Sequence, residues 1–387
     1  MNQLSDRLRG LTQSDIRRMS RECERVGGIN LGQGICDLPT IPELIEGATE
    51  AIVGSKATYS KFEGIDVLRE RIARKIGHFN GYRVDPATEV VVTVGSTGGF
   101  ATAAMATLNA GDEVILFEPY YGYHLNTIKV LGATPRFVPL EPPDWTIDFD
   151  RLRAAFGPRT RAIVVCTPSN PCGKVFTREE LERIGALCHE FGAWAITDEI
   201  YEYIVYDGRR HVSMASIDSC LDVTITISGF SKTFSVTGWR IGYVTAQPKI
   251  ASAIGLLNDL FYVCAPTPLQ WGIARGLEVG DDYYRQLAES YEKKRDILAV
   301  TLREIGLEPF LPQGAYYMLA DISSSFPNDG EAATALLEQA RVASIPGSAF
   351  YVSERGTKML RFCFAKDFEA LEEACRRLKA ARLVAKG

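Results

Sequence analysis

The chain has 387 residues, of which 46% are hydrophobic and 24% are charged, values that are ordinary for a globular protein with a large core. At about 150 residues per domain this length corresponds to two or three domains, and the composition excludes a wholly disordered chain. The 43 basic and 48 acidic residues give a net charge of −5, so the basic surface that nucleic-acid binding requires is not expected.

Membrane and metal sites are not indicated either. No segment reaches the roughly 18 apolar residues of a membrane span, and the first residues lack the apolar stretch of a signal peptide, so we expect a cytoplasmic protein. The nine cysteines are odd in number and scattered, which is typical of reduced thiols that pack as small hydrophobic side chains. The four histidines are not spaced to share a helical face, so no metal site is predicted.

Short apolar, β-branched runs alternate with helical stretches between about residues 89 and 245. Runs that are apolar on both faces and separated by helices indicate a mainly parallel sheet with helices on both sides. Thr177, with Glu180 three residues later, has the capping-box pattern of a crossover helix. The sequence therefore predicts a large α/β domain over residues 46–280. Its predicted strands are EVVVTVG, EVILFE, TPRFVPL, TRAIVVCTP, AWAITDE, DVTITIS and RIGYVTA.

After residue 280 the pattern changes to a long amphipathic helix. It is followed by the strand-like GAYYMLADI, a helix over about 331–339, the strand-like KMLRFCFA and a final helix from Asp367. This order predicts a second, smaller α+β domain. The N-terminal segment is too short to fold alone, so we expect residues 1–45 to pack onto 281–387 and complete the small domain.

The segment SGFSKTFSVTGWRIGY, residues 228–243, follows an apolar strand and has Lys232 just past the strand end. A lysine there can lose its solvent, and the lowered pKa makes its amine a nucleophile that forms an imine with an aldehyde. Arg240 lies eight residues later and can bind a phosphate through its guanidinium. The alternatives are a solvated surface lysine and a P-loop, whose GxxxxGK[ST] spacing is absent here.

The same segment resembles the lysine signature of the class I/II, fold-type I aminotransferases, which use pyridoxal phosphate (PLP). This resemblance implies the PLP-transferase fold type I and a Schiff base between Lys232 and PLP. Many relatives have a serine three residues before the lysine, where this chain has Gly229, which leaves open whether Ser228 contacts the phosphate. The matching positions are Gly229, Ser231, Lys232, Ser235, Val236, Gly238, Arg240, Ile241 and Gly242.

Further elements of the family follow in the expected order. Asp198, in TDEIY, matches the carboxylate that keeps the ring nitrogen of PLP protonated, so that the ring accepts electrons. Tyr201 matches the tyrosine that hydrogen-bonds the phenolic oxygen of PLP. The predicted catalytic residues are therefore Lys232, Asp198 and Tyr201. Taken alone, the DxxY pattern would also suit a helix N-cap followed by a core tyrosine.

Two other segments supply predicted cofactor-binding residues. In VTVGSTGGFATAAMATL a strand leads into a helix whose free N–H groups suit an anion, so Ser96, Thr97 and Gly98 are predicted to bind the PLP phosphate. The glycine spacing there differs from the GxGxxG of dinucleotide-binding loops. In EPYYGY, Tyr121 matches the aromatic residue that stacks on PLP, and Tyr120 is the alternative.

Three residues are assigned to the substrate. Asn170, in TPSNPCG, resembles the asparagine that contacts both the PLP ring oxygen and the substrate carboxylate. Arg361, in MLRFCFA, resembles the arginine that binds the substrate α-carboxylate through two parallel hydrogen bonds. Gly34, in LGQGICDLP, resembles the glycine whose backbone lies over the substrate. Plain turns at Asn170 and Gly34 and a surface ion pair at Arg361 are the alternatives.

Tyr59, in ATYSKFEG, resembles the tyrosine that reaches the PLP phosphate of the neighbouring subunit, which implies a homodimer with shared active sites. As a whole the resemblance implies a ping-pong aminotransferase that acts on an L-amino acid and a 2-oxo acid. Some relatives specific for acidic substrates have lysine at the position of Thr97, so a neutral or aromatic amino donor is favoured. The candidates for the side-chain pocket are Tyr123, Phe261, Tyr262 and Tyr316.

Two other functions use the same cofactor. A PLP-dependent C–S β-lyase, which eliminates a leaving group from cysteine conjugates or cystathionine, is the first alternative. A PLP-binding transcription regulator is the second, but it needs a DNA-binding domain for which the roughly 30 residues before Asn30 leave no room.

Overall fold

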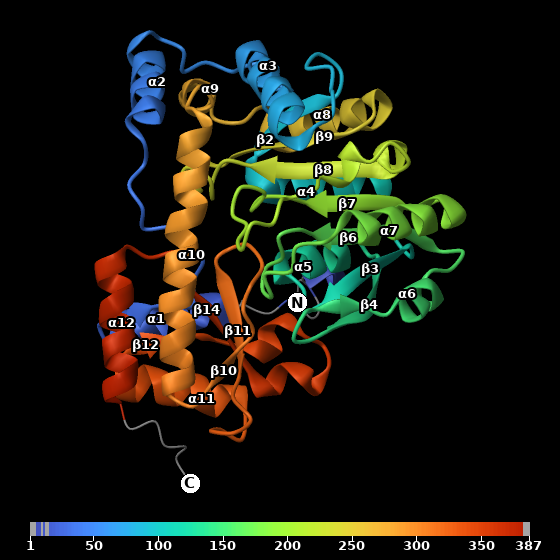
Figure 1. Ribbon diagram of the computed structural model, residues 1–387. Helices are drawn as coiled ribbons and strands as arrows, with labels where there is room; N and C mark the ends of the chain where they lie inside the picture. The colour runs from blue at the N-terminus through green and yellow to red at the C-terminus, as the bar shows by residue number, and fades with distance from the viewer. Residues whose placement is uncertain (1–4, 9–10, 12–14, 382–387) are drawn as a thin grey trace, which may run out of the picture.

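The computed structural model of the protein describes residues 5–8, 11 and 15–381. Two sheets dominate the fold, and the long helix α10 (Asp281–Glu304) runs beside both (Figure 1). Within the described residues the larger sheet has eight strands, in the order β2-β9-β8-β7-β6-β3-β4-β5. Their bounds are β2 (Val90–Val94), β3 (Glu113–Glu118), β4 (Thr134–Glu141), β5 (Thr146–Ile147), β6 (Thr160–Cys166), β7 (Trp194–Asp198), β8 (Thr224–Gly229) and β9 (Ile241–Thr245).

The larger sheet is mainly parallel, which confirms the prediction. Strands β8, β7, β6, β3 and β4 are parallel, and β2 runs the same way because it and β8 are both antiparallel to β9. Strands β9 and β5 run in the opposite direction. The carboxyl ends of β2, β8, β7 and β6 therefore meet at one edge, where β9 begins. Open α/β sheets bind their ligands at this edge.

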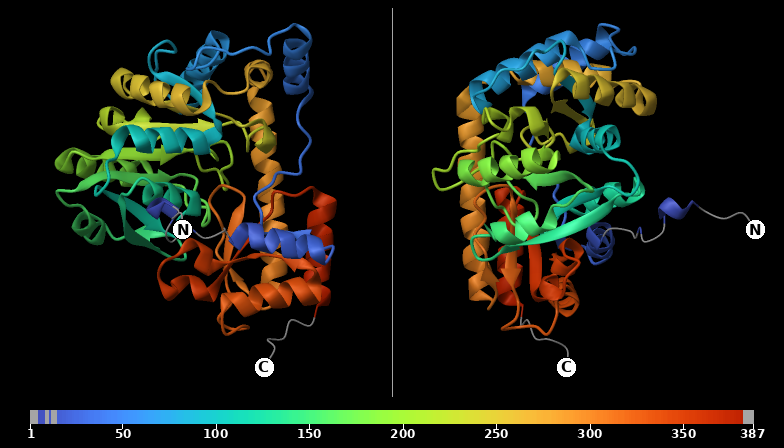
Figure 2. Two further views of the ribbon diagram at one scale, coloured as in Figure 1. Left: turned by 180° about the vertical axis from the view of Figure 1, so that it is seen from behind. Right: turned by 90° about the vertical axis from the view of Figure 1, so that its right-hand side faces the viewer.

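Helices cover both faces of the larger sheet (Figures 1 and 2). Side chains alternate between the faces along each strand, and their apolar members form separate clusters. Val91, Leu116 and Val164 pack on the face of α4, whereas Ile115 and Val165 pack on the face of α7. The covering helices are α4 (Gly95–Thr107), α5 (Gly122–Val130) and α8 (Pro248–Tyr262) on the first face, and α3 (Asp66–Lys75), α6 (Phe149–Ala155), α7 (Arg178–Phe191) and α9 (Thr267–Gly276) on the second.

The crossover helix α7 begins as the sequence predicts. The Thr177 hydroxyl accepts the N–H of Glu180 at 3.2 Å, and the Glu180 carboxylate accepts the N–H of Thr177 at 2.9 Å. The helix ends at Gly192, which adopts a left-handed conformation with φ 64°. These two signals fix the length of the crossover and so the start of β7, the strand that ends at Asp198.

The smaller sheet is antiparallel and is built from the C-terminal part of the chain. In the part of the chain that the structure describes it has four strands, ordered β10-β11-β14-β13. On β14, Arg361 lies between Leu319 of β11 and Ile345 of β13. The bounds are β10 (Glu308–Pro309), β11 (Tyr317–Asp321), β13 (Ile345–Pro346) and β14 (Met359–Cys363), and helices α11 (Asp329–Ala335) and α12 (Phe368–Ala380) lie beside them.

The N-terminal part of the chain lies beside this smaller sheet. Strand β1 (Ile29–Asn30) pairs in parallel with β12 (Val342–Ala343), and α1 (Asp15–Arg25) contacts β12 and β13. Helix α2 (Pro42–Val53) packs instead against α9, at the far end of the larger sheet. The domain ranges 46–280, 1–45 and 281–387 stay a prediction, and residues 1–4, 9–10, 12–14 and 382–387 of the small domain lie outside the described residues.

All nine cysteines lie among the described residues, and each carries a free thiol. Seven of them are buried, which confirms that they pack as small hydrophobic side chains. None of the described helices combines the length and the apolar character that crossing a membrane requires.

Candidate active site

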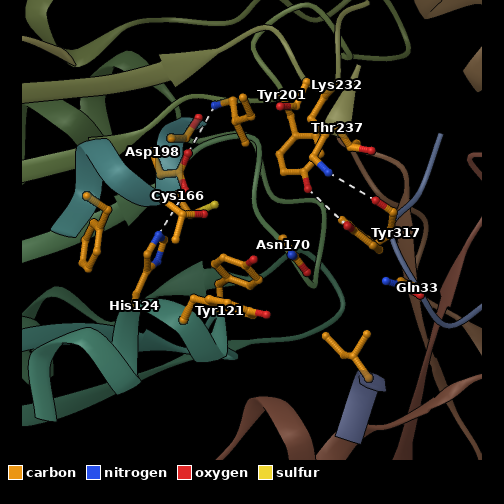
Figure 3. A pocket seen from close by; sticks show the side chains of 18 of the residues that line it. Gln33, Tyr121, His124, Cys166, Asn170, Asp198, Tyr201, Lys232, Thr237 and Tyr317 are labelled. Carbon is orange, nitrogen blue, oxygen red and sulfur yellow. Dashed lines mark hydrogen bonds and ion pairs between the residues drawn. The ribbon is translucent and has the colours of Figure 1, made fainter. Parts of the chain in front are cut away.

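A cavity lies at the carboxyl edge of the larger sheet and is closed from the other side by residues of the smaller sheet (Figure 3). Segments from almost the whole length of the chain meet there. Ten of the residues predicted from the sequence line it: Gly34, Ser96, Thr97, Tyr121, Asn170, Asp198, Tyr201, Lys232, Arg240 and Arg361. Two predicted residues, Gly98 and Tyr59, are not in the lining.

Lys232 lies in the turn that follows β8. Its Nζ donates a hydrogen bond to the carbonyl oxygen of Gly34 at 3.2 Å and lies 5.7 Å from the centre of the Tyr316 ring. Burial lowers the pKa of Lys232 below its ordinary value, because the ammonium loses its water. A lowered pKa makes the neutral, nucleophilic amine easier to form.

Gly34 approaches Lys232 and the two tyrosines of the smaller sheet very closely. Its carbonyl oxygen accepts hydrogen bonds from Lys232 and, at 3.3 Å, from the hydroxyl of Tyr316. A Cβ atom on Gly34 would lie 1.8 Å from the hydroxyl of Tyr317. No larger residue fits at position 34 unless Tyr317 moves, so this glycine is more than part of a plain turn.

Asp198 ends β7 as a buried carboxylate, and two groups fix its orientation. The Nε2 of His124 lies 3.0 Å from Asp198 Oδ2 (Figure 3), and the N–H of Ile200 donates to Oδ1 at 3.3 Å. His124 is buried too, with Tyr121 edge-on at 88° and Phe100 tilted against it at 4.3 Å. The carboxylate is thus held at the cavity wall, where it can accept a further hydrogen bond.

The predicted tyrosines differ in their surroundings. Tyr121 lines the cavity, whereas Tyr120 is buried and packs against Phe137 at 5.5 Å, so Tyr121 is the aromatic residue available to a ligand. Tyr201 donates its hydroxyl to the hydroxyl of Tyr317 at 3.2 Å (Figure 3). Burial raises the pKa of Tyr201 well above its ordinary value, so it remains a neutral hydrogen-bond donor.

One end of the cavity suits a phosphate. Helix α4 begins at Gly95 without a side-chain cap, so its first N–H groups are available to an anion, and Ser96 and Thr97 of this turn line the cavity. The guanidinium of Arg240 packs onto Gly95, since a Cβ there would lie 2.4 Å from Arg240 Nη2. Arg240 donates to the carbonyl oxygen of Thr237 at 3.0 Å and has no carboxylate partner among the described residues.

Ser228, whose contact with the phosphate the sequence leaves open, is not in the lining. Its hydroxyl is buried and donates to Glu202 Oε1 at 2.8 Å. The hydroxyl of Ser96 lies instead beside Gly229, 2.8 Å from where a Cβ of residue 229 would be. Ser231, one residue before the lysine, lines the cavity.

A buried polar cluster lies behind Ser228. Lys75 forms an ion pair with Glu202, and His211 Nε2 lies 2.9 Å from Glu199 Oε2. Each of three side chains offers one possible metal-ligand atom, and these atoms lie within 4.8 Å of one another, close enough to bind one metal ion together. The three residues are Glu199, Glu202 and His211. The ammonium of Lys75 already supplies a positive charge there, so we assign this cluster to support of β8.

Arg361 and Asn170 meet where the smaller sheet borders the cavity. Arg361 Nη1 donates to Asn170 Oδ1 at 2.9 Å, and Nη2 donates to the carbonyl oxygen of Gly32 at 2.5 Å. The guanidinium lies 4.3 Å from the ring centre of Tyr317 and 4.6 Å from that of Phe350. It is almost fully buried, its Nε has no partner, and no described carboxylate pairs with it, so a surface ion pair is excluded.

Several lining residues were not predicted from the sequence. Ser231 and Tyr317 adjoin predicted residues, but His124 and Arg17 belong to no motif. Of the four aromatic candidates for the side-chain pocket, Tyr123 lines the cavity, whereas Phe261 and Tyr262 are partly exposed on α8 and Tyr316 lies behind Lys232. The unpredicted lining residues are Ile16, Arg17, Gln33, Phe100, His124, Thr127, Cys166, Ile200, Ser231, Thr237 and Tyr317.

Comparisons with known proteins identify the class. The chain belongs to the family of class I and II aminotransferases, whose model matches residues 26–378. It is 33% identical to human (Homo sapiens) kynurenine–oxoglutarate transaminase 1, over 91% of this chain and 92% of that protein. It is also 33% identical to aromatic-amino-acid aminotransferase 2 of Thermococcus litoralis, over 97% of both chains.

Solved structures agree with this class. N-succinyldiaminopimelate aminotransferase of Mycobacterium tuberculosis superposes with a TM-score of 0.94 at 35% identity, over 97% of this chain and 99% of that one. The protein is therefore a PLP-dependent aminotransferase of fold type I, and the fold, the enzyme class and the cofactor predicted from the sequence are confirmed.

Proposed function

We propose that this aminotransferase takes the amino group of a neutral or aromatic L-amino acid and transfers it to a 2-oxo acid in a ping-pong reaction. One observation carries the proposal. The amine of Lys232, the carboxylate of Asp198 and the guanidinium of Arg361 line the same cavity, and Arg361 is buried without a carboxylate partner. A buried arginine of this kind calls for an anionic ligand.

The cavity fits PLP at both of its ends. A Cβ at Gly95 would fill the space beside the Arg240 guanidinium, so glycine keeps this cradle open at the uncapped start of α4. We assign the phosphate to Arg240, Ser96 and Thr97, together with the neighbouring N–H groups of α4. We assign the ring to Tyr121, Asn170, Asp198 and Tyr201, and the covalent link to Lys232.

The residues of the cavity then have separate roles in the reaction. Bound PLP supplies an electron sink for the negative charge that develops at the substrate Cα. Arg361 and Asn170 hold the α-carboxylate, while Gly34 lies over the substrate and next to Lys232. With its lowered pKa, the amine of Lys232 takes the Cα proton as a general base and delivers it again as a general acid. Asp198, held by His124, keeps its negative charge aimed at the ring nitrogen.

The uncharged part of the lining favours a neutral or aromatic side chain. It includes Ile16, Phe100, Tyr123 and Ile200, with Thr97 where a lysine would attract an acidic side chain. The names of two relatives, a kynurenine–oxoglutarate transaminase and an aromatic-amino-acid aminotransferase, support a donor of this class.

A screen of amino donors tests this function. PLP-loaded enzyme is mixed with each amino acid in turn, and the visible absorbance of the cofactor and the 2-oxo acid product are measured. We expect aromatic and large neutral donors to react with a kcat/KM at least about tenfold above that of aspartate, because burying a ring in the cavity stabilises their complexes. Without an acceptor each reaction should stop after one equivalent. Continued release of pyruvate and ammonia from a cysteine conjugate would identify the β-lyase instead.

We also propose a homodimer with shared active sites. Tyr59 is 81% exposed, and the loop that carries it lies beside α8, where Asn258 donates to the Phe62 carbonyl oxygen at 2.8 Å. Leu256 and Leu260 of α8 are also exposed, so both α8 and the loop that packs against it present apolar side chains to solvent. Apolar surface of this kind marks an interaction site, and a second copy of the chain would bring Tyr59 to the cavity of its partner.

Tyr59→Phe is therefore expected to weaken PLP binding by roughly tenfold, because one hydrogen bond to a charged phosphate is lost. Cofactor affinity is measured by fluorescence titration, and the oligomeric state by analytical ultracentrifugation. Mixed dimers provide a sharper test: at a PLP concentration too low to load the Tyr59→Ala enzyme, Tyr59→Ala and Lys232→Ala subunits should together regain activity, since one of the two shared sites is intact. A monomeric wild-type enzyme with full activity would refute the proposal.

A further inference from the structure

The lining of the cavity has one cation without an assigned partner. Among the described residues that line it, the charged side chains are those of Arg17, Asp198, Lys232, Arg240 and Arg361. Arg240 is assigned to the phosphate and Arg361 to the α-carboxylate. Asp198 is held by His124, and Lys232 has a lowered pKa. Arg17 is the arginine that remains, and no group of PLP or of a monocarboxylic amino acid requires it.

Arg17 is not engaged within the protein. It lies in the first turn of α1 with an exposed side chain, and among the described residues it has neither a hydrogen-bond nor an ion-pair partner. Its neighbour Arg18 differs, because Arg18 pairs with Asp15 at 3.0 Å and does not line the cavity. Helix α1 therefore places Arg17 at the cavity, whereas the charge of Arg18 is paired with that of Asp15.

The position of Arg17 is fixed by the helix that carries it. Ser20, three residues later and thus on the same face of α1, donates its hydroxyl to Gln33 Oε1 at 2.9 Å and accepts from Asn30 Nδ2 at 3.0 Å. Met19 is buried in the core of the same region. Gln33 also lines the cavity (Figure 3), so the contact with Ser20 ties α1 to the cavity rim.

We propose that Arg17 is the specificity-determining residue for dicarboxylic substrates, and that it binds their distal carboxylate while Arg361 binds the α-carboxylate. The inference rests on the proposed function and deepens it, since it assigns a substrate class to one residue. A guanidinium forms two parallel hydrogen bonds with a carboxylate, and a cationic cleft attracts an anion. An aromatic donor needs no counter-charge, and the exposed Arg17 stays in water when such a donor is bound.

Two acceptors that differ in the distal carboxylate test the proposal. With one aromatic donor, kcat/KM is measured for 2-oxoglutarate and for 2-oxopentanoate in the wild type, Arg17→Gln and the matched control Arg18→Gln. Arg17→Gln should lower the value for 2-oxoglutarate by about 10- to 100-fold and leave that for 2-oxopentanoate unchanged. Arg18→Gln should change neither. An equal loss for both acceptors, or no loss, would overturn the inference.

A binding measurement separates this inference from the catalytic proposal. Glutarate and pentanoate, which cannot accept an amino group, are titrated calorimetrically into the holoenzyme. Glutarate should bind more tightly than pentanoate in the wild type and in Arg18→Gln, and this preference should disappear in Arg17→Gln. If the wild type preferred glutarate, Arg17→Gln lost this preference and no transamination occurred, the proposed function would be refuted and Arg17 would still be the carboxylate ligand. Transamination with a preference that survives in Arg17→Gln would refute the role of Arg17.

Discussion

Replacement of Lys232 by alanine is expected to lower turnover by roughly 10⁴-fold or more, because it removes the residue to which we assign the transfer of the Cα proton. The contacts of Lys232 Nζ are the carbonyl oxygen of Gly34 and the ring of Tyr316, and neither can act as a base at neutral pH. The variant should also lose the visible absorbance of covalently held PLP. Steady-state kinetics and an absorbance spectrum of the purified holoenzyme measure both effects.

The loss should not come from unfolding. The pKa of Lys232 is lower in the folded chain than in the unfolded one, so protonation of its amine opposes folding, and this opposition declines as the pH rises from the folded pKa to the unfolded pKa. The cofactor-free variant should therefore be at least as stable as the wild type in a thermal melt. Lys249→Ala, an exposed lysine on α8, is the matched control and should keep both colour and activity. A coloured, active Lys232→Ala enzyme would refute the assignment.

Asp198→Asn is expected to lower kcat by about 10²- to 10³-fold, the usual effect of removing one fixed electrostatic contact from an active site. Asparagine keeps the shape of the side chain and can still contact His124 and the N–H of Ile200. The substitution removes the negative charge that we propose holds a proton on the ring nitrogen of PLP. The fall should therefore appear in kcat more than in the affinity for PLP, which the other contacts of the cavity maintain.

The exposed pair of His189 and Asp222, 3.3 Å apart, provides the control for Asp198→Asn. Asp222→Asn removes a carboxylate from a similar pair outside the cavity and should leave the kinetics unchanged. If Asp198→Asn reduced the affinity for PLP while the fully loaded enzyme kept its kcat, the carboxylate would serve in cofactor binding alone.

The positions of Lys232, Asp198 and Asn170 could be predicted because each belongs to a motif that resembles the aminotransferase family, and each lies at or just beyond the carboxyl end of a parallel strand. Such ends share one edge of a sheet, so local patterns in the sequence were enough to bring these residues together. The turn from Gly229 to Arg240 was equally accessible, since its residues are close neighbours in the chain.

Ser228 shows how a shift of one position along a strand changes what a side chain contacts. Successive residues of a strand point to opposite faces, so a shift of one position from Gly229 places the side chain on the other face of the sheet. The hydroxyl of Ser228 accordingly contacts Glu202 on the other side. Gly98 shows a related effect. It lies in the first turn of α4, but a side chain at this position would point toward Val94 and Tyr262 rather than into the cavity.

His124, Tyr317 and Arg17 could not be predicted in the same way. Each reaches the cavity through packing between elements that are distant in the sequence: His124 through α5, Tyr317 through the smaller sheet and Arg17 through the contact of Ser20 with Gln33. None of these contacts leaves a periodic or local pattern in the chain. Arg17 and Arg18 are adjacent arginines, and nothing in the sequence tells which of the two reaches the cavity.

The reversed direction of β9 limits how this enzyme's chain can change in length. Strand β9 has five residues and spans roughly 15 Å, so in a parallel orientation Arg240 would begin on the opposite side of the sheet from Lys232. Because β9 is antiparallel to β8, both ends of the segment between them stay at one edge, and that segment carries Lys232 and Arg240 eight residues apart. Surface loops commonly accept insertions and deletions. In this segment a change in length has to be absorbed between residues 233 and 239, because β8 and β9 hold the two ends that carry Lys232 and Arg240.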